Sequence, residues 1–72
     1  MRFKITYLAA TVLYIDGGRD HHLSMDDTLR VERNGKTLGT IKVTAVSRQS
    51  SAAVTLTQAV PFVVGDAAVI LK

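Results

Sequence analysis

Residues 28–46, TLRVERNGKTLGTIKVTAV, decide the fold, because two alternating runs of residues flank one tight-turn signal. Asn34-Gly35 is typical of a two-residue type I′ turn, in which both residues need positive φ. The alternation on either side predicts two half-buried strands, Thr28 to Arg33 and Lys36 to Ser47. Gly39 interrupts the second strand, which predicts a β-bulge where the sheet bends. The stretch therefore predicts an antiparallel hairpin.

The sequence on both sides of this turn contains an internal repeat. The segment FKITYL at 3–8 matches IKVTAV at 41–46 with an offset of 38 residues. The segment MDDTLRV at 25–31 matches VGDAAVI at 64–70 with an offset of 39. A repeat of about half the chain predicts two similar halves, about 1–36 and 37–72, that close one core around a pseudo-twofold axis.

The remaining strands follow from the same alternation of apolar and polar residues. Gly17-Gly18 ends the second strand, and Arg19 to Asp27 is predicted as a polar surface loop. The predicted strands are Arg2 to Leu8 (Phe3, Ile5 and Tyr7 inward), Thr11 to Asp16, Ala52 to Thr57 (Val54 and Leu56 inward) and Ala67 to Lys72. No helical periodicity of useful length occurs. We therefore predict an all-β fold: a single domain, residues 1–72, that forms a small closed six-stranded barrel.

Composition limits what such a barrel can be. The chain has 72 residues and no cysteine, which excludes disulfides and thiolate metal sites. With 47% hydrophobic residues it can still build a dense core of aliphatic side chains. No apolar run approaches the ~20 residues that span a bilayer, so no membrane span is predicted.

Two aspartates occupy matching places in the repeat. Asp27 and Asp66 each precede an alternating strand, where a short carboxylate can accept backbone N–H groups of its own turn. Gly65 before Asp66 permits a left-handed conformation. Asp26 holds the matching position in the first half, and aspartate tolerates that conformation better than most residues. With Asn34 and Gly35, these residues are predicted to have structural roles in turns.

The succession of motifs from Thr11 to Val69 resembles a known family. The motifs are Gly17-Gly18, Leu23-x-Met25-x-Asp27, Leu29-x-Val31-x-Arg33-Asn34-Gly35, Leu38-Gly39-x-Ile41-x-Val43-x-x-Val46, Ser50-Ser51-Ala52-x-Val54 and Val64-Gly65-Asp66-x-x-Val69. They resemble the small β-barrel at the C-terminus of flagellar assembly protein T, and are similar to the β-domain of the rod-shape protein MreC and to cradle-loop barrels. The resemblance implies a non-catalytic binding or assembly module of the bacterial cell envelope or periplasm. The family's Gly-Leu-x-x-Gly-Asp pattern is replaced here by residues 22–27, HLSMDD.

The first loop holds the residues that could carry chemistry. Asp20, His21 and His22 lie close in sequence to Asp26 and Asp27, and imidazole and carboxylate ligands suit zinc or nickel. Adjacent histidines tend to point apart, however, and there is no third histidine, so a solvated loop is the favoured interpretation. Ser24 beside them lacks the buried acid and oxyanion hole of a hydrolytic triad. We predict no enzymatic activity and no cofactor.

Partner binding is the function that the pattern favours. If Leu13, Ile15, Ala68 and Ile70 face the core, the residues left outside form an apolar patch, predicted as the partner-binding surface: Val12, Tyr14, Val69 and Leu71. A register shift of one residue would exchange the two faces. The predicted function is association with a protein partner or with a second copy.

Nucleic-acid binding is the alternative. The net charge is +3, and five basic residues fall on predicted outward positions: Arg2, Lys4, Arg30, Lys42 and Lys72. Such residues could form a stripe that contacts phosphate groups.

Overall fold

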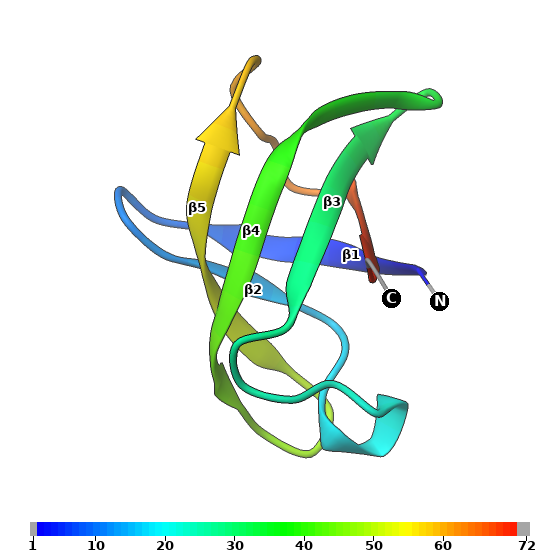
Figure 1. Ribbon diagram of the computed structural model, residues 1–72, viewed down its shortest axis with the longest axis vertical. Helices are drawn as coiled ribbons and strands as arrows, with labels where there is room; N and C mark the ends of the chain where they lie inside the picture. The colour runs from blue at the N-terminus through cyan, green and yellow to red at the C-terminus, as the bar shows by residue number, and fades with distance from the viewer. Residues whose placement is uncertain (1, 71–72) are drawn as a thin grey trace.

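Six strands and one 3-10 turn make up the structure, a computed structural model that describes residues 2–70. The elements are β1 (Arg2–Leu8), β2 (Leu13–Ile15), η1 (Arg19–His21), β3 (Thr28–Arg33), β4 (Lys36–Val46), β5 (Ser51–Gln58) and β6 (Ala67–Ile70). Neighbouring strands pair antiparallel in the order β1-β2-β5-β4-β3-β6, and β6 pairs with β1 (Figure 1). The predicted all-β, closed six-stranded barrel is confirmed. Exchanging β1, β2 and β3 with β4, β5 and β6 leaves this circular order unchanged.

The hairpin of β3 and β4 has the expected turn. Asn34 and Gly35 have φ of 53° and 80°, the positive values that a type I′ turn requires. The register of the pair shifts between Val31 and Glu32, next to Gly39. A Cβ atom at Gly39 would lie 2.1 Å from the carbonyl oxygen of Thr57. Glycine at this position therefore lets β5 approach the bent part of β4.

A β-bulge in β1 reverses the alternation of its side chains. The register against β2 shifts between Ile5 and Tyr7, which makes Thr6 an extra residue. The Thr6 hydroxyl donates a hydrogen bond to the carbonyl oxygen of Tyr14 at 3.3 Å. Beyond the bulge Tyr7 points outward and is 55% exposed. The prediction that Tyr7 lies in the core is therefore wrong.

The second half of the chain has the matching bulge in β4. The register against β5 shifts between Val43 and Ala45, so Thr44 is the extra residue there. Its hydroxyl donates to the carbonyl oxygen of Ala52 at 3.4 Å. Thr6 and Thr44 are related by the repeat offset of 38 residues.

β5 presents the opposite face to the one predicted. Ala53 is fully buried between Leu13 on β2 and Val43 on β4, whereas Leu56 is 51% exposed. Val54 is only half-buried, so the assignment of both large residues to the core is wrong. Because Leu13 and Val43 already fill the interior beside β5, the inward position there takes a small side chain.

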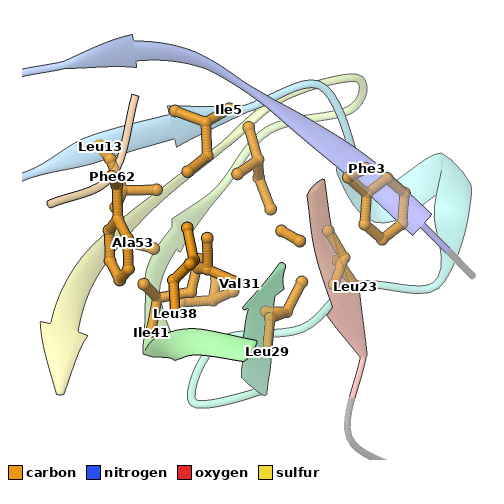
Figure 2. Packing of buried hydrophobic residues seen from close by; sticks show 13 residues of the cluster. Phe3, Ile5, Leu13, Leu23, Leu29, Val31, Leu38, Ile41, Ala53 and Phe62 are labelled. Carbon is orange, nitrogen blue, oxygen red and sulfur yellow. The ribbon is translucent and has the colours of Figure 1, made fainter. Parts of the chain in front are cut away.

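The core is one cluster of aliphatic residues with a phenylalanine near each end. Leu23 and Phe62 come from the two long loops, occupy matching places in the repeat and lie on opposite sides of the cluster (Figure 2). Each loop therefore contributes one side chain that covers the barrel interior. The buried hydrophobic residues are Phe3, Ile5, Leu13, Ile15, Leu23, Leu29, Val31, Leu38, Ile41, Val43, Ala53, Phe62 and Ala68.

Candidate functional site

The turn before β6 is fixed by a carboxylate that is almost completely buried. The side chain of Asp66 is 3% exposed and accepts the backbone N–H of Val63 at 2.8 Å. Arg33 donates to both of its oxygens, through Nε and Nη2, at 2.8 Å each. These hydrogen bonds, led by those from Arg33, lower the pKa of Asp66 against the opposing effect of burial. Arg33 also donates to the carbonyl oxygen of Pro61 at 3.1 Å, so one guanidinium holds β3 to the loop.

The turn before β3 has the matching local geometry. Asp27 accepts the backbone N–H of Ser24 at 2.9 Å. Asp26 has φ of 70°, and Gly65 at the matching position has φ of 99°. The side chain of Asp27 is half-buried rather than buried.

Backbone hydrogen bonds join each of these turns to a neighbouring strand. Ile5 on β1 accepts from Gly65 N–H and donates to the Asp66 carbonyl oxygen, each at 2.9 Å. Val43 on β4 bonds in the same way with Asp26 and Asp27, at 2.8 and 2.9 Å. Ile5 and Val43 are related by the offset of 38 residues. The roles of the turn residues are thus structural, because their polar groups are used within the barrel.

A hollow of about 420 Å³ lies beside the Arg33–Asp66 pair. Its lining includes three basic side chains, Arg2, Lys4 and Arg33, and three acidic ones, Asp16, Glu32 and Asp66. These formal charges cancel, so the hollow does not select ligands by charge.

The first loop does not assemble a metal centre from its predicted residues. Within residues 2–70, no group of three histidine, cysteine, aspartate or glutamate side chains is arranged to hold an ion. Nδ1 of His21 accepts the Gly18 backbone N–H at 3.2 Å, and the ring contacts Phe3 edge-on with centroids 5.7 Å apart. His22 is exposed with φ of 65°, and Asp20 is exposed at the start of η1. His21 therefore supports the loop through its ring.

The predicted partner-binding residues lie in separate places. Tyr14 on β2 is 43% exposed, and Val12 just before β2 is half-buried. Val69 is half-buried on β6, where it pairs with Arg2 of β1. Tyr14 pairs with Tyr7, five residues further along β1, or about 15 Å at the usual rise per residue. Tyr14 and Val69 thus do not form one patch. Leu71 lies outside the described residues.

The bulge at Thr6 creates a different apolar surface. It places Tyr7 beside Tyr14, with ring centroids 5.7 Å apart and ring planes at 34°. Tyr14 pairs across β2 and β5 with Ala52, and Ala52 pairs with Ala45 on β4. We call the row Tyr7, Tyr14, Ala52 and Ala45 the aromatic face. The repeat carries the signal for it, since both bulged positions are threonines in matching segments.

The predicted basic stripe is largely neutralised by acidic neighbours. Glu32 forms ion pairs with Arg30 and, at 3.4 Å, with Arg2. The ammonium group of Lys42 lies 3.4 Å from the carboxylate of Asp26. Lys4 is exposed, and Lys72 lies outside the described residues.

Comparison with protein-family models finds no match to the chain, and comparison with curated proteins finds none either. In the part of the chain that the structure describes, no helix is long and apolar enough to cross a membrane.

Proposed function

We propose that the barrel is a non-catalytic module that binds a protein partner through the aromatic face. The observation that carries the proposal is the stacked pair of exposed tyrosines, Tyr7 at 55% and Tyr14 at 43% exposure. Tyrosine is enriched among the residues that dominate binding energy at protein interfaces. A tyrosine ring offers a large contact area at a low cost in side-chain entropy.

The neighbours of the tyrosines support this use. Ala52 and Ala45 continue the row with small side chains, so the rings stand beside a flat strip on which another surface can lie. The resemblance to assembly barrels of bacterial envelope proteins agrees with such a role, and we propose an envelope or periplasmic assembly as its setting.

Site-specific crosslinking tests the proposal. A photoreactive residue in place of Tyr14 should give a discrete protein adduct in cells that produce the chain, whereas the same residue at exposed Thr37 on β4 should not. Binding of the purified adduct partner to Tyr14→Ser should be weaker by about tenfold or more, because a tyrosine anchor contributes at least ~1.4 kcal/mol. Thr37→Ser is the matched control and should bind as the wild type does.

Two results would contradict the proposal. Equal adducts at positions 14 and 37 would mean that the aromatic face has no preferred partner. Adducts with nucleic acid, whose affinity falls steeply with salt, would favour the alternative function, since phosphate contacts release counterions.

A further inference from the structure

The second half of β5 has a strand neighbour on one side only, among the residues that the structure describes. β5 pairs with β4 from Ser51 to Gln58, but with β2 only from Ser51 to Ala53. Figure 1 shows this part of β5, in yellow, running past the β1–β2 hairpin with β4 on its other side. Residues 54–58 are therefore an open sheet edge within a barrel that is otherwise closed.

The main chain of this edge is available for pairing. The N–H of Ala59 donates to the carbonyl oxygen of Leu38 at 2.8 Å, so Ala59 faces β4. Because successive residues in a strand alternate in direction, the N–H and C=O of Gln58 face the open side. No other described residue donates or accepts a hydrogen bond there, and the side chains of residues 55–58 are all exposed. Such an edge is a template for another strand.

A small hollow lies next to the edge. Its volume is about 190 Å³, and it separates Thr55 and Gln58 from Ala9, Ala10 and Val12 in the segment between β1 and β2. It is smaller than the ~300 Å³ at which ligand pockets begin. It therefore suits one side chain of an adjacent segment better than a small molecule.

The surroundings define the chemistry of that segment. No charged residue occurs within 8–15 or within 49–65, so both sides of the hollow are neutral. Natural edge strands are commonly protected by charges or proline, and residues 54–58 have neither. A bulge beside Leu56 bends the edge without covering it.

We propose that this edge binds an extended, uncharged segment of another protein, which pairs as an additional strand beside residues 54–58. One small apolar side chain of the segment occupies the hollow. A complete second copy fits less well, because it would bring its own segment 9–12 against that of the first. A single extended segment needs only the ~4.8 Å that separates neighbouring strands. This site is separate from the aromatic face, so the two can be tested independently.

Selection from a phage-displayed library of short random peptides on the immobilised protein tests the proposal. The expected winners have uncharged centres with alternating β-branched residues. A synthetic winner should slow hydrogen exchange of the amides within 54–58. Thr55→Lys should weaken its binding by about tenfold or more, since it places a charge at the edge and disturbs one or two hydrogen bonds. Thr37→Lys on β4 is the matched control, and Tyr14→Ser should also bind normally.

Each other result overturns the proposal. No enrichment of peptides, or protection from exchange elsewhere on the barrel, means that the edge does not bind strands. Equal binding by Thr55→Lys and Thr37→Lys means that the contact lies away from β5. Protection of 54–58 that rises with protein concentration and needs no peptide means that the edge binds a second copy instead.

Discussion

Asp66 shows how one buried carboxylate can organise three parts of a small barrel. Its oxygens accept from Arg33 on β3 and from Val63 in the loop, while its carbonyl oxygen accepts from Ile5 on β1. A buried charge is tolerated when it is paired and fully hydrogen-bonded, and both conditions hold here. Removing the carboxylate leaves the Arg33 guanidinium and the Val63 N–H without their main partner.

We expect Asp66→Ala to lower the free energy of unfolding by about 1–3 kcal/mol, the cost of leaving such donors unsatisfied. The measurement is chemical denaturation followed by circular dichroism. Asp20→Ala removes an exposed carboxylate and serves as the control. Equal midpoints for the two variants would show that the Asp66 side chain adds nothing to stability.

The same carboxylate predicts a dependence of stability on acid. Its pKa lies below the ordinary value of 3.8 in the folded barrel, so the unfolded chain takes up a proton first as pH falls. The contribution of Asp66 is therefore complete above the ordinary pKa and is lost as pH falls through the lowered one. Urea denaturation at a series of acidic pH values should give a flatter profile for Asp66→Asn than for the wild type. Parallel profiles would remove this residue as a source of acid sensitivity.

At the scale of elements, turns and bulges set which side chains face inward. The turn of the β3–β4 hairpin depends on backbone conformation alone, because a Cβ atom at Gly35 would have no heavy atom within 4 Å. Its φ of 80° is nevertheless unfavourable for any β-branched residue.

Gly35→Val should therefore destabilise the barrel by about 1 kcal/mol or more, through strain rather than through a clash. Lys36→Val places the same side chain on the adjacent exposed residue and should cost much less. Thermal melting of the two variants makes the comparison. Identical melting temperatures would mean that the turn tolerates another geometry.

Elements announced by a local signal could be predicted, whereas those decided by the partner strand could not. Asn34-Gly35 identifies the β3–β4 hairpin, and the repeat indicates the two aspartate turns. Tyr7 was assigned to the core because strict alternation gives no sign of an inserted residue such as Thr6. The surface beside Tyr14 was consequently sought on β6, at Val69, instead of on β1. On β5, apolar residues occupy both faces, so alternation alone could not identify the inward one.

At the scale of the whole molecule, stability depends on how well the two long loops cover the barrel interior. A domain of this size has about 4–11 kcal/mol of stability at 0.05–0.15 kcal/mol per residue. Leu23 and Phe62 are 2% and 7% exposed, one in each loop. Either side chain represents a large part of the total.

Leu23→Ala and Phe62→Ala should each lower the free energy of unfolding by about 2–4 kcal/mol, from lost burial and from the cavity left behind. Val63→Ala, next to Phe62 but 49% exposed, should change it by less than about 0.5 kcal/mol. Denaturant midpoints measure all three. A loss confined to one of the two loops would show that the halves do not contribute equally.

The circular strand order has a kinetic consequence. The β3–β4 hairpin joins residues close in sequence, whereas β1 and β6 pair Arg2 with Val69 across nearly the whole chain. Closing such a long loop costs entropy that its contacts repay only afterwards, which slows folding of topologies rich in distant pairs. The hairpin should thus be structured early in the folding transition state and the β1–β6 seam late. Weakening the seam would then accelerate unfolding and leave the folding rate almost unchanged.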